Sequence, residues 1–102
     1  MADTLNNIAL VYDVLGKYDL ALEHYEISLR IKKATLGDDH PSVATTLVNM
    51  GKVERAQGKF DQALEHYQQG LKVFKAALGD DHPSVAITLL NMGVVLRTWA
   101  VV

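Results

Sequence analysis

The sequence predicts an all-α protein built from helix–turn–helix units stacked in a row. Three observations lead to this prediction. The chain repeats itself at a shift of 42 residues, its apolar residues recur at helical spacing, and no segment alternates with the period of two that is typical of a strand. With 102 residues, the chain is expected to form one domain at most.

The internal repeat defines the organisation of the chain. The nine letters LGDDHPSVA stand at 36–44 and again at 78–86, and ALEHY stands at 21–25 and at 63–67. The same register places Asn49, Met50 and Gly51 opposite Asn91, Met92 and Gly93. We therefore expect a single array of two repeats and a partial third, with boundaries at 2–43, 44–85 and 86–102, as a segment of a longer array.

Each unit is predicted to contain two helices. In the second unit, the residues along one face of the first helix follow at helical spacing: Val43, Leu47, Met50 and then Val53 or Glu54. The longer second helix carries an unbroken stripe, Phe60, Leu64, Tyr67, Leu71, Phe74 and Leu78. Gly58 separates the two helices and Gly79 ends the second. Asp81 or His82 is expected to cap the following helix, with Pro83 in its first turn.

Small residues predict where helices approach closely. Ala9, Gly51 and Gly93 occupy one position in the first helix of the three units, and a small side chain there shortens the distance between helix axes. The aromatic residues beside them have the helical spacing of core residues, although the same rings could form a ligand cage. The last helix, expected from Ser84 to about Trp99, is apolar nearly all round and lacks the second helix that would cover it.

Composition excludes several classes of function. The formal net charge is -2 and the sequence pI is about 6.0, so no electrostatic attraction to nucleic acid or anionic lipid is expected. The chain contains no cysteine, and no apolar run approaches the roughly 18 residues of a membrane span. No signal peptide is visible at the start. We expect a cytoplasmic protein with no nucleic-acid or membrane partner.

The sequence offers little support for catalysis. The DDH triplets at 38–40 and 80–82 contain metal-ligand residue types, but each precedes a proline and is explained by helix capping. Glu65 and His66 lie beside the apolar stripe and are expected to face water. No nucleophile–base arrangement or phosphate-binding loop is present. We therefore expect no enzyme activity, no cofactor and no metal.

The residue pattern resembles that of the tetratricopeptide repeat family. The resemblance rests on Leu47, Met50, Gly51, Gly58, Phe60, Ala63 and Tyr67, with a similar series in the first unit. The typical repeat of that family has 34 residues, whereas the longer second helix ending in LGDDHP resembles the kinesin light chain subclass. The resemblance implies a right-handed superhelix of antiparallel helix pairs that acts as a protein-binding scaffold or adaptor.

In this family the first helix of each unit lines a concave groove that holds a peptide or a helix. The resemblance places these groove residues at Asn7, Val48, Asn49, Lys52, Arg55, Leu90, Asn91 and Arg97. The three asparagines occupy one repeat position, and each amide could pair with a peptide backbone or with a neighbouring helix. The basic residues predict a ligand with apolar and acidic groups.

The uncovered last helix predicts an alternative function in self-assembly. A solenoid needs terminal repeats with a polar outer face, and here the end is apolar. As this alternative, we expect homodimers or end-to-end stacking through Ile87, Leu90, Val94, Val95 and Trp99.

Overall fold

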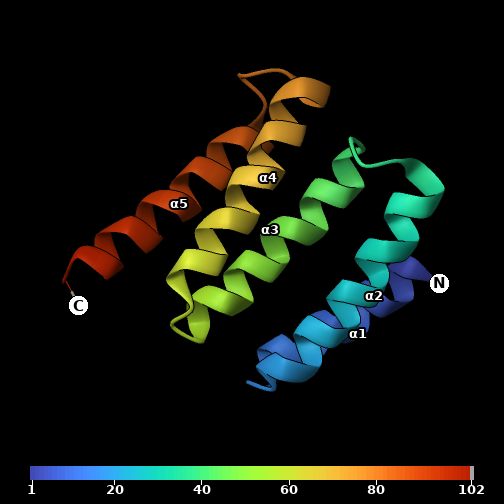
Figure 1. Cartoon of the computed structure of the whole chain (residues 1–102), viewed down its shortest axis with the longest axis horizontal. Helices are drawn as coiled ribbons and strands as arrows, with labels where there is room; N and C mark the ends of the chain where they lie inside the picture. The colour runs from blue at the N-terminus through green and yellow to red at the C-terminus, as the bar shows by residue number, and fades with distance from the viewer. Residues whose placement is uncertain (102) are drawn as a thin grey trace.

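The computed structural model describes residues 1–101; Val102, the last residue of the expected third repeat, lies outside the described residues. Five helices follow one another from one side of the molecule to the other (Figure 1). Helices α1 (Ala2–Val14) and α2 (Tyr18–Leu36) form the first antiparallel pair, and α3 (Pro41–Ala56) and α4 (Phe60–Leu78) form the second. The single helix α5 (Pro83–Val101) packs on this second pair. The described part of the chain is therefore all-α, as the sequence predicts.

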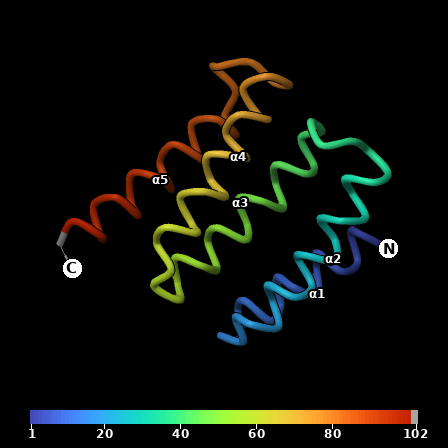
Figure 2. Tube along the Cα trace, in the orientation of Figure 1, coloured from blue at the N-terminus to red at the C-terminus, as the bar shows by residue number. Residues whose placement is uncertain are grey.

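The turns 37–40 and 79–82 connect each helix pair to the next unit. The repeat boundaries expected from the sequence, after residues 43 and 85, thus fall inside α3 and α5, because these helices begin at Pro41 and Pro83. The Cα trace shows the three units as a layered row with α5 outermost at one side (Figure 2). The row measures 40 × 33 × 18 Å along its principal axes.

Histidine, rather than aspartate, caps the first helix of each later unit. The Nδ1 atom of His40 accepts a hydrogen bond from the Ser42 backbone N–H at 3.0 Å, and His82 accepts one from Ser84 at 3.1 Å. At the C-terminal end of α4, Gly79 has φ 88°, a value that L-residues with a side chain rarely adopt. The repeated LGDDHP segment is therefore a structural connection that ends one helix and starts the next.

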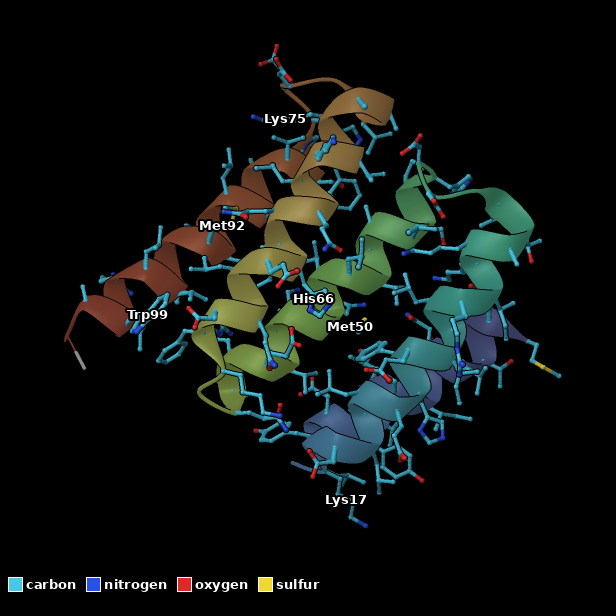
Figure 3. All side chains as sticks on the ribbon, in the orientation of Figure 1. Lys17, Met50, His66, Lys75, Met92 and Trp99 are labelled. Atoms are coloured by element: carbon cyan, nitrogen blue, oxygen red, sulfur yellow. The ribbon has the colours of Figure 1, made fainter. Side chains whose placement is uncertain are left out.

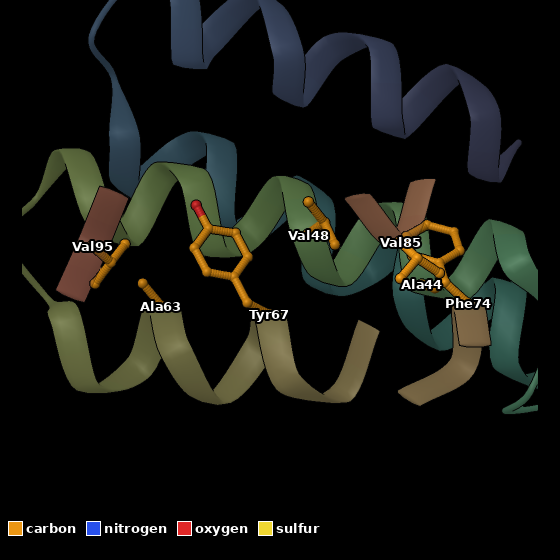
Figure 4. Packing of buried hydrophobic residues seen from close by; sticks show 7 residues of the cluster. All are labelled: Ala44, Val48, Ala63, Tyr67, Phe74, Val85 and Val95. Atoms are coloured by element: carbon orange, nitrogen blue, oxygen red, sulfur yellow. The ribbon is translucent and has the colours of Figure 1, made fainter. Parts of the chain in front are cut away.

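The apolar core consists of two clusters, one for each helix pair and its neighbour. The first contains Ala9, Ala21, Tyr25, Met50 and Val53. The second contains Ala44, Val48, Ala63, Tyr67, Phe74, Val85 and Val95 (Figure 4). Of the two sequence alternatives at the end of the α3 stripe, both Val53 and Glu54 are buried, so α3 is covered on more than one face.

Helices α3 and α4 approach each other closely at Gly51. A Cβ atom placed on Gly51 would lie 2.7 Å from the Tyr67 Cε1 atom and 3.2 Å from the Ala63 carbonyl oxygen. The Tyr67 ring therefore occupies the space that a side chain at residue 51 would need, as the position of the ring between α4 and α3 in Figure 4 shows. The expected role of the small residue is confirmed at Gly51, but at Gly93 no described atom beyond its own stretch of helix lies within 4 Å of an added Cβ.

Candidate functional site

A hollow of about 140 Å³ lies between α3 and α5. Its lining comes from α3, α4 and α5: Thr45, Val48, Asn49, Lys52, Phe74, Ser84, Ile87 and Thr88. Val48 and Phe74 are 6% and 5% exposed and form an apolar floor, whereas Ile87 is 53% exposed. Asn49 and Lys52 add an amide and an ammonium group to the lining. The hollow therefore combines an apolar base with polar and cationic groups.

The structure brings together only part of the predicted groove. Val48, Asn49 and Lys52, and also Ile87 from the predicted self-association set, line the hollow. The remaining predicted groove residues lie outside this hollow: Asn7, Arg55, Leu90, Asn91 and Arg97. Leu90 is 69% exposed on α5.

The three equivalent asparagines have different surroundings. Asn7 is exposed on α1, whereas Asn49 and Asn91 are partly buried. The Nδ2 atom of Asn91 is buried without a hydrogen-bond partner in the described part of the chain. An unpaired buried donor is unfavourable, and because this atom is buried it is not exposed to a ligand in the groove.

The predicted self-association residues do not all lie on a surface. Val95 is fully buried in the second core cluster, which excludes it from any contact with another molecule. Val94 is partly buried. Trp99 is 43% exposed, and its ring centroid lies 6.2 Å from that of Phe60. A second, wider hollow of about 440 Å³ beside Trp99 includes Lys59 and Phe60, but none of the predicted groove residues line it.

Sequence reasoning missed a buried lysine between the first two units. Lys32 is 5% exposed, and its Nζ atom donates hydrogen bonds to Thr46 Oγ1 at 3.0 Å and to the Ser42 carbonyl at 3.4 Å. Thr46 Oγ1 in turn lies 3.2 Å from Asn6 Oδ1 on α1. Burial lowers the pKa of Lys32, and the charge of Asp3 opposes this effect. The signal was present in the repeat register, because Lys32 occupies the position of Phe74 and interrupts the apolar stripe of α2.

The sequence suggested that His66 faces water, but its side chain packs against Glu54. Its Nδ1 atom lies 2.5 Å from Glu54 Oε1, and the two side chains are 24% and 7% exposed. Figure 3 places His66 at the centre of the molecule, far from the ends of the array. The hydrogen bond to Glu54 is the main cause that raises the pKa of His66 above its ordinary value; burial opposes it, and the charges of Glu54, Glu65 and Glu26 add to it. This pair holds α4 to α3.

The His66–Glu54 pair predicts a pH-dependent stability. A raised pKa in the folded state means that the folded protein binds the proton more tightly than the unfolded chain does. The stabilisation is therefore fully present below the unfolded-state pKa of about 6.5, and it is lost as the pH rises through the folded-state pKa. Urea unfolding of the wild type across this window should show the loss, whereas His66→Gln should not.

The matched control for this prediction is His24→Gln. His24 occupies the same repeat position as His66, but its Nδ1 atom meets the Leu20 carbonyl oxygen at 2.8 Å instead of a carboxylate. A variant His24→Gln that removes the pH dependence while His66→Gln retains it would contradict the assignment.

Two kinds of feature are absent from the described residues: a cluster of metal-ligand side chains and a membrane-crossing helix. Among residues 1–101, no three His, Cys, Asp or Glu side chains come together in a way that could hold a metal ion. Within the same residues, no helix combines the length and the hydropathy that a membrane crossing requires.

Comparison with known proteins gives consistent results. The family model for the tetratricopeptide repeat matches residues 1–76 and 42–100. The fold is similar to the crystal structure of BtubC (BKLC) from P. vanneervenii, with a TM-score of 0.88, 28% identity, and coverage of 95% of this chain and 38% of that one. It is also similar to a putative kinesin light chain of Podospora anserina with nearly identical TPR-like repeats, with a TM-score of 0.82, 21% identity, and coverage of 96% and 46%.

The chain thus spans less than half the length of each of these two structures. No curated protein sequence matches the chain significantly.

Proposed function

Because the chain belongs to the tetratricopeptide repeat family, with repeats like those of kinesin light chains, we propose that it is an interaction scaffold that holds a peptide or a short helix in a concave groove along α3 and α5. The repeats of this family generally serve as scaffolds for protein partners rather than as catalysts. The observation that carries the proposal is the hollow between α3 and α5, where Val48, Asn49 and Lys52 stand together with Ile87.

The lining of this hollow indicates the chemistry of the ligand. The floor formed by Val48 and Phe74 favours one apolar side chain. Lys52 supplies a positive charge beside that floor, and Asn49 supplies both a donor and an acceptor for a peptide backbone. The proposed ligand is therefore an extended or helical segment with an apolar anchor next to an Asp or Glu residue.

A peptide library tests this proposal. Each peptide would carry one apolar residue flanked by Asp and Glu, and a second library would carry Lys in their place. We expect the acidic library alone to yield binders, and we expect Lys52→Glu to weaken their affinity about tenfold, the equivalent of about 1.4 kcal/mol. Fluorescence polarisation would give the Kd values.

Two controls make the result interpretable. Lys33→Glu changes an exposed lysine on α2, outside the hollow, and should leave the affinity unchanged. Asn49→Ala should weaken binding without altering unfolding. Equal binding of the acidic and basic libraries, or equal effects of the two lysine substitutions, would contradict the proposal.

Self-assembly is a second candidate function, and a different surface favours it. On α5, the exposed fractions of Leu89, Leu90 and Leu96 are 47%, 69% and 53%. The equivalent helix of the second unit, α3, is largely buried. Groove variants such as Asn49→Ala should not affect association through this surface.

A further inference from the structure

Two hollows of the structure occupy the same place at consecutive contacts between units. One is the hollow between α3 and α5, and the other, of about 350 Å³, is formed by α1, α2 and α3. At the shift of 42 residues, the lining residues that correspond are Asp3, Lys32 and Ser42 in the α1–α3 hollow and Thr45, Phe74 and Ser84 in the α3–α5 hollow. The repeat therefore presents one site twice within the same molecule.

The two sites differ in the residue that the second helix of each unit supplies. Phe74 of α4 is 5% exposed and belongs to the same apolar cluster as Ala44 and Val85 (Figure 4). Lys32 of α2 is equally buried, at 5% exposure, but it ends in an ammonium group. One site therefore has an apolar base and the other has a cationic one.

The neighbours of Lys32 have changed together with it. Thr46 Oγ1 accepts a hydrogen bond from Lys32 and lies 3.2 Å from Asn6 Oδ1. Asn6 stands at the repeat position of Val48. The counterpart of Thr46, Thr88, donates to a backbone carbonyl of its own helix at 2.8 Å instead. The contact between the first two units is thus polar at several linked positions, rather than at one substituted residue.

The charge of Lys32 has no counter-charge beside it. Its two hydrogen-bond acceptors, the Thr46 hydroxyl and the Ser42 carbonyl, are both neutral, whereas an ammonium group has three N–H donors. Among residues 1–101, no carboxylate oxygen lies within 4 Å of Lys32. A buried charge without a partner is unfavourable, so a carboxylate that reached this site would be strongly favoured.

His40 adds a second donor at the border of the α1–α3 hollow. Its Nδ1 atom accepts the Ser42 backbone N–H at 3.0 Å. The proton of the neutral imidazole is therefore on Nε2, which remains a donor. A cation together with a further N–H donor suits an anionic group.

We infer that Lys32 is a specificity-determining residue that selects an acidic side chain of the ligand at the contact between the first two units. The apolar anchor of the same ligand lies one repeat further on, over Val48 and Phe74. The inference rests on the groove function proposed above, and it adds a second point of contact to that function. The partner is a segment that carries a further Asp or Glu at a fixed distance from its apolar anchor.

The distance between the two sites sets the spacing within the ligand. The Thr46–Asn6 contact places α1 against α3, and α5 also packs on α3. Helices in contact lie about 8–10 Å apart, which an extended peptide spans in about three residues. The acidic residue is therefore expected about three positions from the apolar anchor.

Four synthetic peptides test the second contact. All carry one Leu next to one Asp, and the residue three positions from Leu is either Asp or Asn, placed before Leu in one pair and after it in the other. In fluorescence polarisation with the whole chain, the distal-Asp peptide of one pair should bind at least about tenfold more tightly than its distal-Asn partner.

Lys32→Met should abolish this preference while the affinity for the distal-Asn peptide stays unchanged. Methionine keeps an unbranched apolar stem and removes the charge. Lys33→Met is the matched control, because it removes the neighbouring, exposed lysine with the same change of net charge, and it should retain the preference. Urea unfolding followed by circular dichroism would verify the fold of both variants.

Asp3→Asn gives a second test with the opposite sign, and it decides the question if Lys32→Met does not fold. Asp3 is exposed and borders the α1–α3 hollow, so its charge opposes the approach of another carboxylate. Its replacement should tighten the binding of the distal-Asp peptide about threefold, as expected for an exposed charge, and should not affect the distal-Asn peptide. Lower stability with unchanged affinities would show that Asp3 itself is the counter-charge of Lys32, which would overturn the inference.

Two further results would also overturn it. The first is equal binding of the distal-Asp and distal-Asn peptides by the wild type in both orders, which would leave the groove function intact. The second is a preference for the distal Asp that Lys32→Met retains. If none of the four peptides binds, the groove function fails and this inference fails with it.

Discussion

Replacement of Gly51 by alanine is expected to lower the free energy of unfolding by about 2 kcal/mol, the typical cost of forcing an extra group into a packed core. The added Cβ would lie 2.7 Å from the Tyr67 ring and 3.2 Å from the Ala63 carbonyl oxygen. Tyr67 is fully buried, so the ring cannot move aside without displacing its neighbours. Guanidinium unfolding measured by circular dichroism gives the change.

The same substitution at Gly93 is the control, and its expected effect has the opposite sign. Gly93 occupies the same repeat position, but beyond its own stretch of helix no atom of the described residues lies within 4 Å of an added Cβ. Alanine is favoured over glycine in an exposed helix interior by roughly 0.8–1 kcal/mol, so Gly93→Ala should raise the stability when measured at a concentration too low for self-association. Destabilisation of similar size at both positions would contradict the packing described for Gly51.

The second large effect is expected for His66→Ala, which leaves the buried carboxylate of Glu54 without its partner. Removing one member of a buried ion pair costs about 3 kcal/mol or more, and the partial exposure of His66 places this variant at the lower end of that range. Thermal unfolding at pH 6, where the pair is charged, is the appropriate measurement.

A second substitution separates loss of the pair from loss of packing. Glu54→Leu introduces the residue that the third unit has at this position, Leu96. The double variant His66→Ala with Glu54→Leu should therefore recover most of the stability, because no unpaired charge remains. If the double variant is as unstable as His66→Ala, the histidine acts through packing rather than through the carboxylate.

The sequence was sufficient for the helices and their order. The apolar stripe from Phe60 to Leu78 and the glycine at 79 predict α4 with the bounds that the structure has. The repeat register and the tetratricopeptide resemblance identify the family correctly. These features are local, so they can be read from spacing and turn residues alone.

The polar contacts between helices could not be predicted in the same way. Spacing shows which face of a helix points inward, but it does not show which residue beside that face a neighbouring helix covers. Glu54 and His66 are 12 residues apart on two helices, and their pairing depends on how α4 packs on α3. Lys32 is a partial exception, since its alignment with Phe74 marks it as an unusual residue for a buried position.

The surface of α5 shows a second limit. A helix that is apolar nearly all round gives no periodic signal for the side that is covered. On this helix the sequence does not separate Val85, which is 2% exposed, from Leu89, which is 47% exposed. It also assigned self-association to Val95, which is fully buried. Only the position of α4 distinguishes the packed side of α5 from the open one.

The buried Lys32 leads us to expect that the stiffness of the array is uneven. Directional bonds from Lys32 to Thr46 and to the Ser42 carbonyl fix the first unit in one orientation on the second. At the next interface the equivalent residue is Phe74, whose apolar contacts tolerate small sliding movements of the helices. We therefore expect bending of the array to concentrate between the second pair and α5, so that the hollow between α3 and α5 could widen or narrow without breaking a hydrogen bond of the Lys32 cluster.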